Sequence, residues 1–125
     1  GGALNTGRFN LAGTGTQTAA LAFGGGPPNT GVTESYNGST WTEVNDLTTA
    51  RRYLCGAGPN TAALGFGRPA SDSATGLTEV WNGTNWTEVN DMGTGRYRFA
   101  GCGATNTAAL GFGGTPPIAA LTEIF

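Results

Sequence analysis

Residues 33–46 read TESYNGSTWTEVND, and residues 78–91 read TEVWNGTNWTEVND. The same text begins a third time at Thr122-Glu123. A period in the forties is typical of repeat architectures, in which one supersecondary unit is copied and each copy needs neighbours to cover its faces. The sequence therefore predicts one continuous repeat segment over residues 1–125, with units at about 6–48, 49–93 and, incomplete, 94–125.

The composition favours short strands and turns over helices. The 125 residues include 23 glycines and 38% apolar residues, with neither lysine nor histidine. We therefore expect an all-β fold. The net charge of -2 gives no field to hold a phosphate backbone, so nucleic acid is not an expected partner. No apolar run approaches the roughly 18–20 residues that cross a bilayer, so membrane insertion is not expected either.

The first two strands of each unit follow from aligning the repeats. First strands are expected at residues 8–15, 51–58 and 96–103, and second strands at 18–23, 61–66 and 107–112. Alternate residues of a strand share one face. We expect the following face to be core in all three units: Ala19, Leu21 and Phe23, Ala62, Leu64 and Phe66, and Ala108, Leu110 and Phe112. The Gly/Pro-rich loops after these strands vary most between units, and variable loops commonly carry recognition.

The third and fourth strands are predicted to be joined at Asn37-Gly38 and Asn82-Gly83. Asn-Gly is a strong signal for a two-residue type I′ hairpin turn, which needs two positive φ angles. This turn would pair Tyr36 with Ser39, and would place Glu34 opposite Trp41. In the next unit it would place Glu79 opposite Trp86. Each hairpin would then have one face of aromatic and carboxylate side chains and one face of hydroxyls.

Four antiparallel strands per unit suit the blades of a β-propeller. The chain resembles the kelch-repeat family of β-propellers in three features: the glycine pairs Gly24-Gly25 and Gly113-Gly114, the pairs Tyr36…Trp41 and Trp81…Trp86, and the arginine that opens each first strand. The likeness covers essentially the whole chain, although the tyrosine-to-tryptophan spacing is shorter than in kelch repeats. The threonine, alanine and glycine bias is similar to that of the repetitive kelch-like proteins of marine phages and bacteria. This resemblance implies a virion or cell-surface setting.

Counting strands predicts two complete blades and three quarters of another. A propeller ring needs at least four blades, so three would leave open sheet edges and uncovered faces, which invite pairing. Two partners could complete the structure: further copies of this chain, through self-association, or further blades of a longer chain.

The residue inventory argues against an enzyme and against a cofactor. Without histidine the chain lacks the copper ligands of galactose-oxidase-like kelch proteins and the base of Ser-His-Asp systems, and without lysine it lacks Schiff-base chemistry. Carboxylates recur at the same position in every unit, whereas a catalytic pair is usually unique. We therefore expect no catalytic residue, no metal site and no bound cofactor.

The charges that recur with the unit are candidates for an architectural role. They are three arginines and three glutamates: Arg8, Arg51 and Arg96, and Glu34, Glu79 and Glu123. A guanidinium suits buried, bidentate pairing with a glutamate or bridging of backbone carbonyls. The alternative is a ring of cations around a central channel that binds an anion.

The candidate ligand-binding residues are aromatic and polar. Trp41 and Trp86 are expected either to pack between blades or to stack on a sugar, since an aromatic face beside carboxylate and amide groups suits a pyranose. Trp81, Asn82 and Asp72 would join them in a glycan site. Cys55 and Cys102 occupy different repeat positions, and we expect two small buried thiols, with a disulfide left open.

Two hypotheses for function follow from the residues. In the first, the chain is a non-catalytic propeller segment that binds a glycan or a surface receptor, and the kelch-like resemblance implies that it does so on a virion or cell surface. In the second, it is a structural assembly module whose open edges join subunits. A third reading, from the kelch resemblance, is the non-catalytic part of a larger oxidase-like enzyme.

Overall fold

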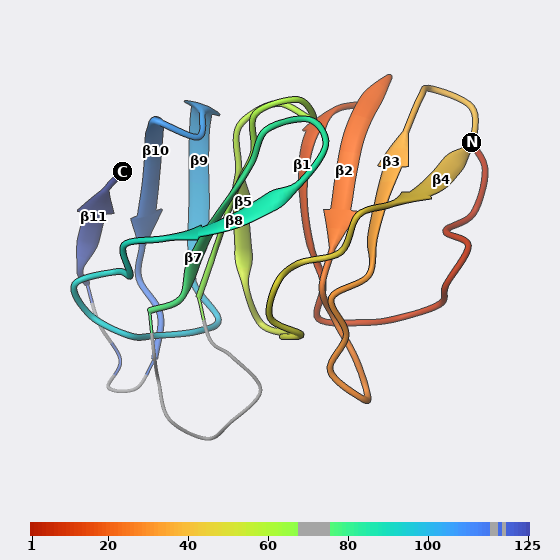
Figure 1. The fold of residues 1–125 in the computed structure, drawn as a ribbon. Coiled ribbons are helices and arrows are strands. Elements are labelled where there is room, and N and C mark those ends of the chain that lie inside the picture. The colour runs from red at the N-terminus through yellow and green to blue at the C-terminus, as the bar shows by residue number, and fades with distance from the viewer. Residues whose placement is uncertain (68–75, 116–117, 119) are drawn as a thin grey trace.

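The computed structural model describes residues 1–67, 76–115, 118 and 120–125. It is all-β, with no helix among these residues, and its strands form three antiparallel sheets (Figure 1). The first sheet contains β1 (Ala12–Thr16), β2 (Ala19–Phe23), β3 (Thr33–Tyr36) and β4 (Trp41–Val44) in that order. The second contains β5 (Cys55–Ala57), β6 (Leu64–Phe66), β7 (Thr78–Trp81) and β8 (Trp86–Val89). The third contains β9 (Ala100–Thr105), β10 (Ala108–Phe112) and β11 (Thr122–Ile124).

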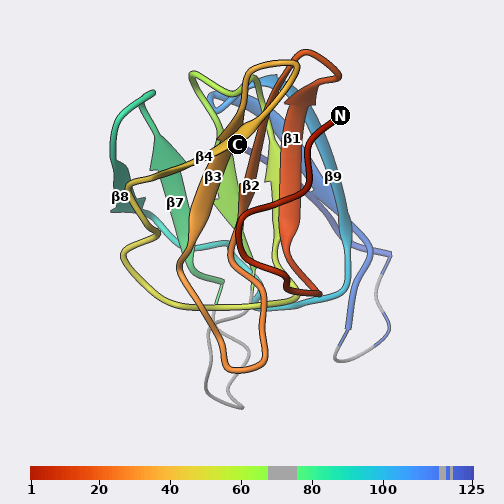
Figure 2. The ribbon, with the colours of Figure 1, turned by 90° about the vertical axis from the view of Figure 1, so that its right-hand side faces the viewer.

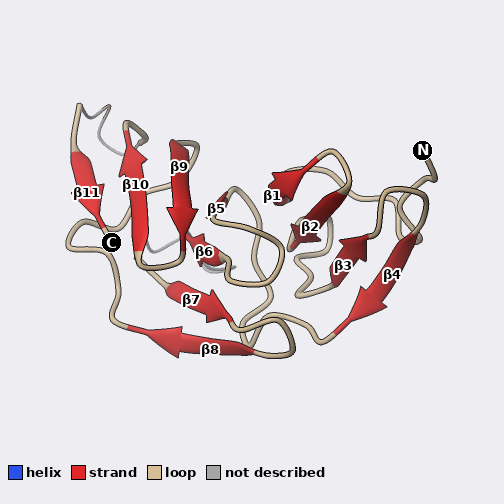
Figure 3. Cartoon of the chain, turned by 90° about the horizontal axis from the view of Figure 1, so that it is seen from above, coloured by secondary structure: helices blue, strands red, loops and turns tan. Residues whose placement is uncertain are grey.

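The sheets are arranged as neighbouring propeller-like blades. The first strands of the three units, β1, β5 and β9, lie next to one another, and the later strands of each sheet spread away from them (Figure 3). A backbone hydrogen bond of 3.2 Å from Gly58 N to Gly103 O links the residue that follows β5 to β9. The described strands do not close into a ring. The prediction of an all-β fold with four-stranded blades, the third one incomplete, is confirmed.

Each boundary between sheets holds one hydrophobic core. Between the first and second sheets lie Leu21 and Phe23 on one side and Ala63, Trp81 and Trp86 on the other. Between the second and third sheets, Leu64 and Phe66 face Ala109, with Phe99 and Phe125 packed beside them. The core therefore forms as two layers between blades, and only the middle blade contributes to both of them.

Glycines bring the sheets close enough for these layers to pack. The ring of Phe66 lies against Gly101 and Gly111, where a Cβ atom would come within 2.6 and 2.7 Å of it. The ring of Phe23 lies against Gly56 and Gly65 in the same way, with both distances 2.9 Å. Any side chain at these positions would push the neighbouring sheet away.

The hairpin register differs from the predicted one by two residues. Tyr36 pairs with Trp41 and Glu34 with Glu43, so Glu34 does not lie opposite Trp41; likewise Glu79 pairs with Glu88 rather than with Trp86. The reason lies in the turn. The Asn37 side chain accepts hydrogen bonds from Ser39 N and Thr40 N, both 2.9 Å, and only Gly38 has a positive φ, 96°. Because the shift is two residues and strand faces alternate with period two, the aromatic and carboxylate side chains still share a face.

The predicted first strands begin too early in all three units. Each starts after a turn in which the second residue beyond the arginine has a left-handed backbone, with φ of 56° at Asn10, 60° at Tyr53 and 54° at Arg98. This conformation interrupts an extended strand. The three arginines therefore lie before the strands rather than within them.

The predicted core is also wrong for the third unit. Leu21, Phe23, Leu64 and Phe66 are buried, as expected, but Leu110 and Phe112 are 38% and 41% exposed. Ile124, which pairs with Leu110 on the same face, is 84% exposed. The cause is position rather than sequence, because no sheet lies over this face of β10 and β11 within the described residues.

Candidate functional site

The repeated arginine and glutamate of each unit form a buried ion pair. The closest nitrogen to oxygen distances are 2.9 Å for Arg8–Glu34, 3.1 Å for Arg51–Glu79 and 3.0 Å for Arg96–Glu123. Only Glu123, in the incomplete unit, keeps part of its side chain, 22%, exposed. All three guanidiniums are buried against carboxylates, which favours the architectural role over the alternative of a cation ring that binds an anion in a central channel.

The middle pair shows how the guanidinium is held. Nη1 of Arg51 donates to the carbonyls of Gly67 and Leu77, at 3.1 and 2.6 Å, and Nη2 donates to Glu79. Burial lowers the pKa of Arg51 from its ordinary value, and the adjacent Glu79 carboxylate opposes that shift. Arg51 thus bridges one backbone carbonyl just after β6 and another just before β7.

The glutamates bind the chain segment that enters their unit. Glu79 accepts a hydrogen bond of 2.9 Å from Thr48 N, and Glu34 accepts one of 2.7 Å from Asn5 N. Glu123 accepts from Gly93 N at the same repeat position. Each carboxylate therefore joins an arginine, a strand and an incoming connection, which is an architectural use of its charge.

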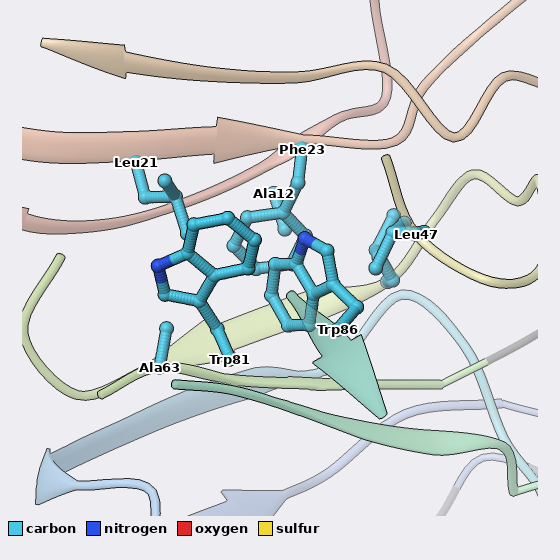
Figure 4. Close-up of a cluster of buried hydrophobic side chains, with 8 residues drawn as sticks. Ala12, Leu21, Phe23, Leu47, Ala63, Trp81 and Trp86 are labelled. Carbon is cyan, nitrogen blue, oxygen red and sulfur yellow. The ribbon is translucent and has the colours of Figure 1, made fainter. Parts of the chain in front are cut away.

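The two tryptophans of the second unit lie between sheets (Figure 4). Trp81 donates from Nε1 to Asn60 O at 3.0 Å, and Trp86 donates from Nε1 to Thr33 Oγ1 at 3.1 Å. Both side chains are buried, and the Trp86 ring packs on Phe23. Neither indole offers the open face that sugar stacking requires.

The remaining predicted ligand-binding residues do not join the tryptophans. Trp41 is half-buried on the first sheet, beside Tyr36, with ring centroids 5.0 Å apart. Asn82 is exposed, but its side-chain oxygen accepts from Thr84 N and Asn85 N, both at 2.9 Å, within its hairpin turn. Asp72 lies outside the described residues. The structure therefore gathers no glycan site from the predicted set.

A different cluster, which the sequence reasoning missed, lies in the turns that precede the first strands of the second and third units. Its members are two arginines and two tyrosines: Arg52, Tyr53, Tyr97 and Arg98. A sequence signal for this cluster was present in the aligned units. At the two positions after the repeated arginine, Phe9-Asn10 is replaced by Arg52-Tyr53 and Tyr97-Arg98, so side-chain chemistry changes on a repeated backbone.

Because the sequence has no histidine, cysteine and acidic side chains are the metal ligands to consider in the described part of the chain. No group of three or more cysteine or acidic side chains is placed to hold a metal ion there. Cys55 is half-buried and Cys102 is exposed, and both are free, so the expectation of two buried thiols is wrong for Cys102. Burial raises the pKa of the Cys55 thiol. No helix capable of spanning a membrane occurs among the residues described.

No protein-family model matches the sequence, and no curated protein shows significant similarity to it.

Proposed function

We propose that this chain is a non-catalytic, kelch-like β-propeller module for binding and display at a virion or cell surface, and that it is completed by stacking its end blades on further copies of itself. The proposal rests on the uncovered apolar face of the third sheet. Assembly supplies the scaffold in this proposal, and the loops and turns at one end of the blades supply recognition.

The uncovered face has the composition of a core layer. It presents Leu110, Phe112 and Ile124, whose counterparts in the second sheet are Leu64, Phe66 and Val80. Leu64 and Phe66 are fully buried because the third sheet lies over them. Complete burial of an apolar side chain of this size contributes about 1.5–3 kcal/mol. Three such side chains together offset a substantial part of the cost of association.

The complementary face lies at the other end of the same chain. In the internal boundary, the second sheet contributes Ala63, Trp81 and Trp86 to the core that contains Phe23. Their counterparts in the first sheet are Ala20, Tyr36 and Trp41, which are only half-buried. Figure 1 places the first and third sheets at opposite ends of the row. One chain therefore carries, on its first and third sheets, the two kinds of face that meet at its internal sheet boundaries. A second copy of the chain fits the open face of the third sheet.

The mass of the chain in solution tests the proposal. We expect light scattering on a sizing column to give a discrete oligomer, and Phe112→Asp to reduce it to the monomer. Val89→Asp is the matched control, because Val89 is also apolar and 39% exposed but lies in the middle sheet, outside the open face. A monomeric parent chain, or equal loss of mass in both variants, would overturn the assembly proposal.

The binding part of the proposal has its own test. The oligomer is labelled and applied to a glycan array and to intact cells, and retention that scales with oligomer size is expected from a display module. Assembly without retention on any surface would leave only the structural role, the second hypothesis drawn from the sequence.

A further inference from the structure

The turns before the first strands hold side chains in a fixed arrangement. Asn10, Tyr53 and Arg98, which are repeat equivalents, all have a left-handed backbone. Such a conformation in non-glycine residues costs free energy and persists where the surroundings determine it. Here backbone hydrogen bonds run from Tyr53 N to Asn10 O, at 2.9 Å, and from Arg98 N to Tyr53 O, at 3.5 Å. The turns of consecutive units are thus tied into one line at the lower end of the molecule (Figure 2).

Two guanidinium groups surround one tyrosine ring on this line. The Cζ atom of Arg98 lies 4.9 Å from the centre of the Tyr53 ring, and that of Arg52 lies 5.2 Å from it. Arg98 also lies 5.7 Å from the Tyr97 ring, and the two tyrosine rings are 5.9 Å apart. Stacking on aromatic rings restrains long arginine side chains without neutralising their charge.

These two arginines differ from the repeated ones in their charge balance. Arg8, Arg51 and Arg96 each have a buried carboxylate, whereas neither Arg52 nor Arg98 forms an ion pair with any carboxylate of the described residues. Arg98 is exposed and Arg52 is partly exposed. The cluster therefore presents two positive charges to solvent on a chain whose net charge is -2.

The chemistry of the cluster selects a ligand class. A guanidinium fork binds a carboxylate through two parallel hydrogen bonds, and the hydroxyl group of a tyrosine can donate to and accept from the hydroxyl groups of a sugar. We propose that Arg52, Tyr53, Tyr97 and Arg98 form a binding site for a carboxylate-bearing glycan at the junction of the second and third units. This inference rests on the binding role proposed above and names its ligand class. The first unit, with Phe9 and Asn10 at these positions, lacks the site.

Trigalacturonic acid is the probe, with the neutral trisaccharide of galactose and inorganic sulfate as comparators, each measured by calorimetry on the full chain. The key variant is Arg98→Asn, because asparagine already occupies the equivalent left-handed position at Asn10. We expect it to weaken trigalacturonate binding about tenfold or more, as loss of a charge-assisted hydrogen bond implies. Arg98→Lys keeps the positive charge but loses the planar guanidinium fork. Its affinity for trigalacturonate should therefore lie between that of the parent chain and that of Arg98→Asn. Phe9→Ala is the matched control in the first unit and should change nothing.

The outcomes separate this inference from the function it rests on. Trigalacturonate binding that Arg98→Asn weakens, with no comparable affinity for neutral trisaccharide or sulfate, supports the site. Undiminished binding by Arg98→Asn, a preference for the neutral sugar, or no affinity for trigalacturonate overturns it. Light scattering of Arg98→Asn and its retention on intact cells report on assembly and display, so those functions can stand when the acidic-glycan site fails.

Discussion

Phe23 and Trp86 meet across the boundary between the first and second sheets, with ring centroids 4.7 Å apart and ring planes inclined by 55°. The two residues come from different repeat units, so the contact belongs to the boundary rather than to either blade. Trp86 also donates a hydrogen bond to Thr33 of the first sheet. Stability of the array should therefore depend strongly on this side chain.

We expect Trp86→Ala to lower the free energy of unfolding by about 3–5 kcal/mol, because it leaves a cavity between two sheets. Trp86→Phe keeps an aromatic ring and loses the hydrogen bond, and should cost less. Trp41→Ala is the control at the same repeat position on an uncovered face. Urea unfolding followed by circular dichroism measures all three, and equal losses for Trp86→Ala and Trp41→Ala in monomeric protein would contradict the layered core.

Removing the carboxylate of the middle ion pair should also be costly. Glu79→Gln leaves the Arg51 guanidinium buried without its counter-charge, for which we expect a loss of about 3–5 kcal/mol. Glu123→Gln should cost less, because the Glu123 side chain is partly exposed in the incomplete unit. The measurement is again urea unfolding, since guanidinium chloride would screen charges. The exposed Glu88→Gln serves as control, and a loss there as large as that for Glu79→Gln would argue against the burial effect.

A methyl group at a close contact between sheets should destabilise the chain only where a sheet lies over it. Gly101→Ala places its Cβ 2.6 Å from the Phe66 ring, and overpacking of this kind costs about 1–3 kcal/mol. Gly13 occupies the same repeat position in the first unit, and its nearest neighbour would be Leu21 O at 3.6 Å. Gly13→Ala should therefore be nearly neutral in thermal unfolding. A loss in Gly13→Ala equal to that in Gly101→Ala would contradict the packing shown here.

The proposed self-association joins two different faces, and mixing variants can show this. Phe112→Asp spoils one face and Trp41→Asp the other, so each variant alone should be monomeric. A contact between unlike faces predicts that an equimolar mixture forms a heterodimer, in which the intact face of each variant meets the intact face of the other. Native mass spectrometry distinguishes the variants by mass. Self-association of Trp41→Asp alone would instead indicate a symmetric contact between two third sheets.

The repeat text predicted the strands well because alternation and turn residues act locally. The four-stranded sheets and the burial of Leu21, Phe23, Leu64 and Phe66 follow from that pattern. The hairpin register was not predicted correctly, because the side chain of Asn37 accepts hydrogen bonds within the turn and thereby changes which residues pair. Exposure of Phe112 could not be read locally either, because the same residue type is buried or open according to whether another sheet lies on it.

The candidate site was missed for a related reason. Sequence reasoning favoured residues that recur, such as Trp86 and Glu79, and the structure uses both for packing and pairing. The cluster around Tyr53 consists of residues that do not recur. Its left-handed backbone positions are occupied by residues other than glycine, so the sequence gives no sign of that conformation. Arg52 and Arg98 meet at the same tyrosine ring because of how two units lie beside each other. The sequence of a single unit does not determine that arrangement.

The left-handed turn position is occupied by asparagine, tyrosine and arginine in the three units, with φ values of 56°, 60° and 54°. Three chemically different side chains thus occupy one backbone geometry, so the side chain at this position can vary while the backbone stays the same. A library that randomises this residue and the one before it, in each unit independently, would change the chemistry of one end of the array while the blades stay the same. The chain is accordingly a natural starting point for selecting new binders, with one adjustable dipeptide for every blade added.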